Sequence, residues 1–143
     1  MKVLFTILLA TLFASCAHGP PPQRNAELIV TYEGTEVHRA GTPYKSLRQF
    51  EKILKDNTKT KYVIFSVRWC DSCKFLNRAL KQSGHWDAVT LIDIDEPWVR
   101  ALAGEMGISN VPTMVVINKN DTIANTFIGP SAIIMHLLIN VDK

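Results

Sequence analysis

The feature that most constrains this chain is a pair of cysteines, Cys70 and Cys73, placed between an apolar run and an amphipathic stretch. The run 62–67 is continuous and apolar, as expected of a strand that is covered on both faces of its sheet. The residues after the second cysteine repeat apolar side chains at helical spacing. A cysteine at the start of a helix has its thiolate stabilised by the helix dipole and by unpaired backbone N–H groups. The sequence therefore predicts a dithiol that is suited to thiol–disulfide exchange.

The same two cysteines could instead form half of a zinc site or a static structural disulfide. The chain has three cysteines and four histidines. No second Cys-x-x-Cys and no Cys/His pair stands at the spacing that a zinc site requires. We therefore expect a redox pair that forms a reversible Cys70–Cys73 disulfide and binds no metal, with the static disulfide as the alternative.

Length and composition indicate one globular domain. The chain has 143 residues, of which 47% are hydrophobic and 20% are charged, and a formal charge of +3. This charge is small and scattered, and no basic block is interleaved with aromatic residues. The composition therefore argues against nucleic acid as a partner.

The amino-terminal segment has the pattern of an export signal. A short positive start precedes the apolar run 3–13, which is too short to span a bilayer. Small residues then lead to Cys16, and this end resembles a bacterial lipoprotein signal, in which cleavage leaves a lipidated cysteine at the new amino terminus. We expect residues 1–16 to be a signal peptide with a lipobox-like end and Cys16 to be the lipidation site. The alternative is cleavage after Ala17, which would release a soluble periplasmic protein.

A proline-rich stretch follows the predicted signal. Three consecutive prolines favour an extended polyproline conformation, so residues 17–26 are expected to form a semi-rigid tether. The folded domain is then expected over residues 27–143. A lipid anchor would hold this domain on the periplasmic side of a bacterial membrane.

Hydrophobic periodicity predicts alternating strands and helices in the domain. Such alternation implies an α/β fold with a central mixed sheet and helices on both faces, and with its site at the carboxyl end of the central strand, where Cys70 falls. The expected strands are 28–31, 62–67, 89–94, 114–117 and 123–127. The expected helices are one that carries Leu47, Phe50, Ile53 and Leu54, one that follows Cys73 and ends near Gly84, one over 97–107 and one opening at Pro130. The inward faces are expected to carry Phe75, Leu76, Ala79 and Leu80 in the second helix, and Ile133, Ile134, Leu137 and Leu138 in the last.

Two separate motifs resemble the thioredoxin superfamily. The segment 69–74, Trp-Cys-Asp-Ser-Cys-Lys, is similar to the family's active-site segment, and the segment 107–113, Gly-Ile-Ser-Asn-Val-Pro-Thr, is similar to its cis-proline signature. The strand ending at 93–95 and Gly129 match in order and spacing, so the resemblance extends over about residues 45–140. It implies a thioredoxin fold with a cis peptide bond before Pro112.

The resemblance also implies roles for individual residues. Cys70 would be the nucleophile and Cys73 the thiol that resolves the mixed disulfide. Substrate would dock against Trp69, Val111 and Pro112, and the reactivity of the dithiol would be tuned by Asp71, Ser72 and Lys74. Simple core packing is the alternative for Trp69, and a solvated surface is the alternative for the charged side chains of Lys74 and Arg68.

Four positions depart from the family pattern. Asp71 and Ser72 stand where Gly-Pro is typical, Ile64 stands where many thioredoxins have a buried acid, and Leu91 stands in place of its lysine partner. The resemblance then implies a specialised relative in which water or a nearby carboxylate serves proton transfer.

The remaining chemistry-bearing residues are expected to be structural. We expect surface or packing roles for His38, His85 and His136, packing for Trp86 and Trp98, and a solvated turn for Asp93, Asp95 and Glu96, which lack the loop spacing of a calcium site.

The function implied is that of a thiol–disulfide oxidoreductase of the cell envelope, acting as a reductase and without a cofactor. Its expected partners are client proteins with disulfides or thiols, an upstream redox partner and the membrane to which it is anchored. The alternative is a non-enzymatic thioredoxin-fold module that binds a partner or delivers a metal such as copper.

Overall fold

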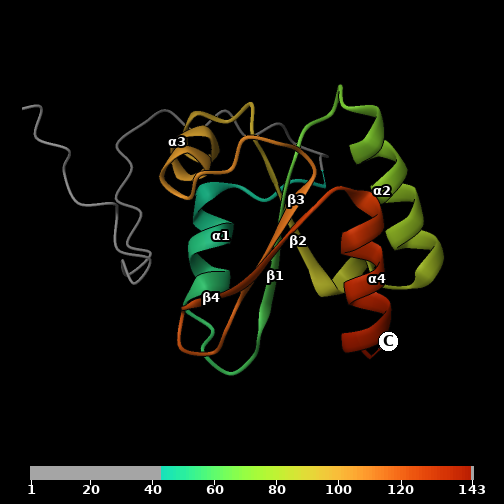
Figure 1. Cartoon of the computed structure of the whole chain (residues 1–143). Helices are drawn as coiled ribbons and strands as arrows, with labels where there is room; N and C mark the ends of the chain where they lie inside the picture. The colour runs from blue at the N-terminus through green and yellow to red at the C-terminus, as the bar shows by residue number, and fades with distance from the viewer. Residues whose placement is uncertain (1–42, 143) are drawn as a thin grey trace, which may run out of the picture.

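The computed structural model describes residues 43–142 (Figure 1). The predicted signal peptide, the lipidation site Cys16, the tether and the opening strand 28–31 lie outside these residues. The described elements are α1 (Leu47–Leu54), β1 (Lys61–Ser66), α2 (Asp71–Ser83), η1 (Trp86–Ala88), β2 (Val89–Asp93), α3 (Pro97–Glu105), β3 (Thr113–Ile117), β4 (Ile123–Ile128) and α4 (Pro130–Asn140). Each predicted helix and strand in this range is therefore confirmed, with ends that differ by a residue or two.

The strands form a mixed sheet in the order β2-β1-β3-β4. β1 pairs in parallel with β2 and antiparallel with β3, and β3 pairs antiparallel with β4. β1 is thus an interior strand, which explains its continuous apolar sequence.

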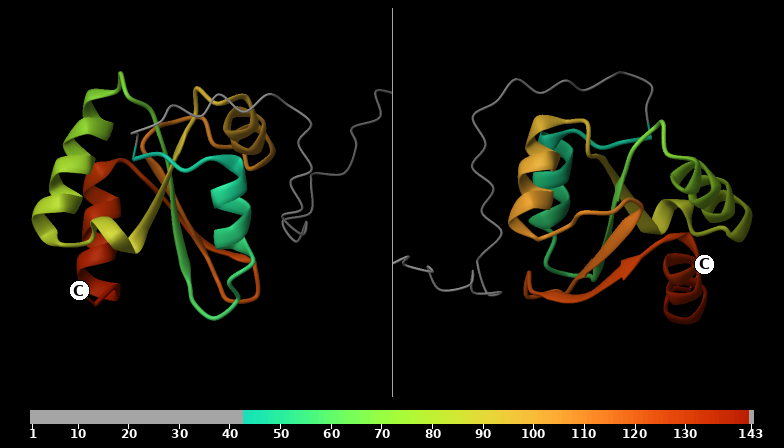
Figure 2. Two further views of the ribbon diagram at one scale, coloured as in Figure 1. Left: turned by 180° about the vertical axis from the view of Figure 1, so that it is seen from behind. Right: turned by 45° about the horizontal axis from the view of Figure 1, so that its top comes forward.

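Figures 1 and 2 show α1 and α3 on one face of the sheet and α2 and α4 on the other. Phe50 of α1 and Trp98 of α3 are buried on one face, together with Val63 and Phe65 of β1. The side chains that alternate with these along β1 point to the other face, because successive strand residues face opposite ways. There a second cluster gathers residues of α2 and α4: Ile64, Leu76, Leu80, Leu91, Ile133 and Leu137. The predicted α/β architecture is confirmed.

Two residues that were expected on inward helix faces are exposed. Phe75 is 50% exposed, because the buried stripe of α2 is Cys73, Leu76 and Leu80, and Phe75 lies beside that stripe. Leu138 is 51% exposed for the same reason, being the neighbour of the buried Leu137. The sequence prediction was wrong at these two positions because consecutive apolar residues cannot all share one helix face.

The chain enters and leaves α2 through two well-defined caps. Cys70 is the N-cap, and its side chain accepts a hydrogen bond from the backbone of Cys73. Gly84 ends the helix with φ 77°, a left-handed conformation that glycine adopts without strain. Within residues 43–142, no helix combines the length and the apolar character needed to cross a membrane.

Candidate active site

The two cysteines lie together at the junction of β1 and α2. Their sulfur atoms are 2.6 Å apart, and both are free thiols. Cys70 is partly exposed, whereas Cys73 is fully buried. A molecule in solution can therefore approach Cys70, whereas Cys73 is shielded from solvent and contacts the Cys70 sulfur.

Hydrogen bonds lower the pKa of Cys70. Partial burial acts in the opposite direction, but donors from Cys73 and Ser72 outweigh it and hold the pKa below its ordinary value. The backbone N–H of Cys73 donates to the Cys70 sulfur over 3.2 Å, and the Ser72 hydroxyl lies 3.1 Å from the same sulfur. These donors stabilise the thiolate, which is the nucleophilic form.

Burial raises the pKa of Cys73. Desolvation is the largest cause, and the hydrogen bond to the Cys70 sulfur adds to it, so that the pKa rises to about 11. Hydrogen bonds from Ser66 and the backbone of Val67 act in the opposite direction. The thiolate therefore forms more readily on Cys70 than on Cys73.

The predicted proline loop faces the dithiol. The Val111–Pro112 peptide bond is cis, as expected from the sequence. The carbonyl oxygen of Val111 lies 3.9 Å from the Cys70 sulfur. The loop is fixed behind by the hydroxyl of Thr113, which donates to the Asn110 carbonyl over 2.7 Å.

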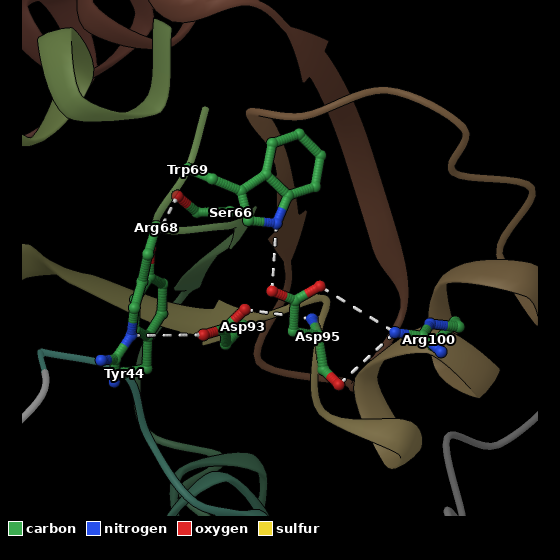
Figure 3. A network of polar contacts seen from close by, with 7 residues as sticks. All are labelled: Tyr44, Ser66, Arg68, Trp69, Asp93, Asp95 and Arg100. Carbon is green, nitrogen blue, oxygen red and sulfur yellow. Dashed lines mark hydrogen bonds and ion pairs between the residues drawn. The ribbon is translucent and has the colours of Figure 1, made fainter. Parts of the chain in front are cut away.

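Trp69 lies on the surface beside the dithiol. Its side chain is 69% exposed, which excludes simple core packing. The indole Nε1 donates to Oδ2 of Asp95 over 3.1 Å, and Asp95 also lies 3.9 Å from the guanidinium of Arg100 (Figure 3). The ring is therefore held at one edge while its faces remain open to solvent.

The charges of the predicted tuning residues offset one another. Lys74 Nζ lies 3.0 Å from the Asp71 carboxylate, and both side chains are largely exposed. Surface ion pairs of this kind contribute little to stability. Of the three residues, Ser72 is the one whose side chain contacts the Cys70 sulfur.

The sheet beneath the dithiol is apolar at the two positions that depart from the family pattern. Ile64 of β1 and Leu91 of β2 are direct partners in register, and both are buried. The polar groups that act on Cys73 come from other positions, Ser66 and Tyr44, neither of which belongs to a sequence motif. The polar Ser66 at the end of an apolar run was the available signal, whereas nothing in the sequence marked Tyr44.

Asp93 is not part of a solvated turn, and that expectation was wrong. Its side chain is buried, with the residue 8% exposed, and it lies 3.7 Å from the guanidinium of Arg68. It also accepts a hydrogen bond from the backbone of Asp95. The pairing with Arg68 is the reason that a carboxylate is tolerated at this depth.

The other residues that were expected to pack do so. Trp98 is buried, Trp86 packs against the core beneath the ammonium of Lys81, and His85 is buried between Ser83 and the Val141 carbonyl. In the part of the chain that the structure describes, no three His, Cys, Asp or Glu side chains gather as metal ligands. His38 lies outside the described residues.

Comparison with known proteins identifies the family. The thioredoxin family model matches residues 42–137. Among solved structures, reduced Schistosoma mansoni thioredoxin pre-protein is 26% identical, with 63% of this chain and 86% of that chain covered and a TM-score of 0.52. Fasciola hepatica thioredoxin is 20% identical, with coverage of 67% and 93% and a TM-score of 0.51. The thioredoxin NaTrxh from Nicotiana alata is 18% identical, with coverage of 73% and 100% and a TM-score of 0.54.

A search of curated proteins returns no match. The family match covers most of the chain, and the sheet, the dithiol and the cis-proline loop agree with it. The chain belongs to the thioredoxin family.

Proposed function

We propose that the protein is a thiol–disulfide oxidoreductase that reduces protein disulfides in the cell envelope through Cys70 and Cys73. Thioredoxin-fold proteins act on disulfide or thiol substrates. The observation that carries the proposal is the division of properties between two adjacent thiols. The accessible Cys70 has a lowered pKa, and the buried Cys73 beside it has a raised one.

The reaction proceeds in two exchange steps. The Cys70 thiolate attacks one sulfur of a client disulfide, which forms a mixed disulfide and releases the other client sulfur as a thiolate. Cys73 then loses its proton and attacks the Cys70 sulfur. This forms the Cys70–Cys73 disulfide and breaks the mixed disulfide, and the second client thiolate leaves and takes up a proton. The client gains two electrons, and an upstream dithiol partner restores the reduced protein.

Client recognition rests on the surface around Cys70. The exposed face of Trp69 offers apolar contact, and the Val111 carbonyl near the Cys70 sulfur offers a backbone acceptor to an extended client segment. Pro112 lacks an N–H group and so leaves the edge of this loop without a competing donor.

The cellular setting is proposed from the amino-terminal sequence. The apolar run 3–13, the lipobox-like end at Cys16 and the proline-rich tether 17–26 support export and attachment to the periplasmic side of a membrane. A reductase that works on envelope proteins would be kept near its source of electrons by such an anchor. Mass spectrometry of the mature protein tests this, since an unmodified chain starting at His18 would contradict lipidation.

Trapping of mixed disulfides tests the enzymatic role. In Cys73→Ala the second exchange step is blocked, so clients should accumulate as covalent adducts on Cys70. Cys70→Ala is the matched control and should trap none, because its remaining thiol is buried and protonated. Equal adducts on both variants would contradict the assignment of Cys70 as the nucleophile.

A further inference from the structure

Two buried hydroxyl groups lie behind the dithiol. The hydroxyl oxygens of Tyr44 and Ser66 are 3.3 Å apart, and the two residues are 5% and 0% exposed. Ser66 is the last residue of β1, whereas Tyr44 precedes α1, so the fold brings together residues 22 positions apart. Ser66 faces the same side of the sheet as Ile64, two residues before it, and α2 covers that side. The Ser66 side chain lowers the pKa of the buried Cys73 by hydrogen bonding, against the effect of burial. Figure 3 shows the Tyr44–Ser66 contact at the edge of the polar network.

A hydroxyl donor near Cys73 would offset the cost of forming a thiolate in a buried position. Cys73 must become a thiolate to attack the mixed disulfide, yet it is fully buried. Burial in an apolar environment disfavours the charged form. The nearby sheet positions Ile64 and Leu91 carry no polar atom in their side chains that could compensate.

The directions of the hydrogen bonds follow from the inventory of donors. A hydroxyl has one O–H donor, so when Ser66 donates to a Cys73 thiolate, its oxygen is left to accept. Tyr44 can then donate to Ser66. The result is a chain from Tyr44 O–H to Ser66 O–H to the sulfur, in which each hydrogen bond strengthens the next.

Burial favours the protonated form of Tyr44. Burial is the main cause that raises the pKa of Tyr44, and Asp93 and Cys73 raise it further. Arg68 acts in the opposite direction, and its guanidinium carbon lies 5.8 Å from the centre of the Tyr44 ring while its Nε contacts Asp93. Among the described residues, the charged and titratable groups that act on Tyr44 are Arg68, Asp93 and Cys73. The raised pKa favours the protonated form of Tyr44, which is the form that can donate to Ser66.

We propose that Ser66 is a further catalytic residue and Tyr44 its positioning residue, and that the two stabilise the Cys73 thiolate during the second exchange step. The inference rests on the proposed exchange function and specifies which groups assist its second half. No atom is transferred to either hydroxyl. The proton of Cys73 passes to solvent, the Cys70–client bond breaks as the Cys70–Cys73 bond forms, and the departing client thiolate takes up a proton.

Stopped-flow mixing of the reduced domain with 5,5'-dithiobis(2-nitrobenzoate) separates the two steps. Attack by Cys70 releases the first equivalent of the coloured thiolate, and attack by Cys73 releases the second. We expect Ser66→Ala to slow the second phase about tenfold and to shift its pH profile upward by ~1 unit, in keeping with loss of one hydrogen bond to a charged group. Tyr44→Phe should give a smaller change of the same sign, and Ser66→Thr should restore the wild-type profile.

Controls separate this inference from the function on which it rests. Tyr62→Phe removes a hydroxyl from another tyrosine, in the same strand as Ser66, and should leave both phases unchanged. The first phase should stay within about twofold in Ser66→Ala, because the donors that lower the pKa of Cys70 are Cys73 and Ser72. An unchanged second phase in both Ser66→Ala and Tyr44→Phe would overturn the inference and leave the exchange function intact. A wild-type protein that released no second equivalent would contradict the exchange function itself.

A direct titration covers the case in which a variant is altered in its fold. The pKa of Cys73 can be followed by NMR of protein labelled with 13C at the cysteine Cβ, without any turnover. Tyr44→Phe keeps the ring and should raise that pKa with the fold unchanged. An unaltered Cys73 titration in a folded Tyr44→Phe variant would contradict the positioning role.

Discussion

The backbone N–H of Cys73 donates a hydrogen bond to the sulfur of Cys70 over 3.2 Å. In the proposed function, the residue that resolves the mixed disulfide thus also helps to activate the residue that forms it. This relationship depends on the start of α2, where Cys70 occupies the N-cap and the N–H groups of the first turn lack partners within the helix. The reactivity of the site and its dependence on pH follow from that geometry.

Alkylation of the two thiols should differ in pH dependence. Because its hydrogen bonds lower the pKa of Cys70, its reaction with iodoacetamide should show a midpoint below the ~8.5 of a free thiol. Cys73 should stay unreactive until the pH approaches about 11. Peptide mapping after timed alkylation at a series of pH values measures both. A midpoint for Cys70 at or above that of free cysteine would contradict the account.

The stability of the reduced protein should fall at alkaline pH. The folded-state pKa of Cys73 is raised to about 11, so between the unfolded pKa of ~8.5 and that value the unfolded chain binds fewer protons than the folded one. The free energy of unfolding therefore decreases as the pH rises through this window. Urea unfolding at pH 8 and pH 10.5 measures the loss, and Cys73→Ala should lose less over the same interval. An equal loss in both proteins would show that Cys73 is not the responsible group.

Trp69→Ala should impair client reduction without unfolding the protein. The indole is exposed and packs into no core, so its removal should change the free energy of unfolding by less than ~0.5 kcal/mol. A loss of client contact should lower kcat/KM for a protein disulfide roughly tenfold, mainly through KM. Phe75→Ala, which removes another exposed aromatic ring, is the matched control. Equal effects of the two substitutions on KM would contradict a docking role for Trp69.

Two neighbouring leucines of α4 should differ in their effect on stability. Leu137 is buried against the sheet and Leu138 is exposed, although the sequence predicted both to face inward. Leu137→Ala should cost about 2–5 kcal/mol, the range for a buried leucine, whereas Leu138→Ala should cost less than ~1 kcal/mol. Thermal or urea unfolding of the pair measures the difference. Similar losses of stability in the two variants would contradict the assignment of Leu137, and not Leu138, to the inward face of α4.

The elements of the fold could be predicted because their apolar residues form clear patterns. The continuous apolar run of β1 and the helical spacing around Phe50 and Leu76 report burial directly. The prediction was wrong at Phe75 and Leu138 because each is next to a buried apolar residue. The sequence alone does not show which of two adjacent apolar residues faces the core.

The reactive pair could also be predicted, but the groups around it could not. Cys70 and Cys73 are close in sequence, and the cis bond before Pro112 follows from a motif. Two contacts depend on how separate elements pack: that of Tyr44 with Ser66 and the ion pair of Arg68 with Asp93. No local sequence pattern predicts them. The sequence therefore predicts a solvated Asp93, whereas in the structure Asp93 is buried and pairs with Arg68.

The reduction potential of the Cys70–Cys73 pair tests the central claim most directly. Equilibration of the purified domain with glutathione or dithiothreitol buffers, followed by quantification of free thiols, gives the value. A dithiol that cycles with clients should have a potential between about −300 and −120 mV, the range of exchange-active family members and their relatives. A potential well below about −300 mV, where structural disulfides lie, would contradict the account and identify the pair as a static bridge.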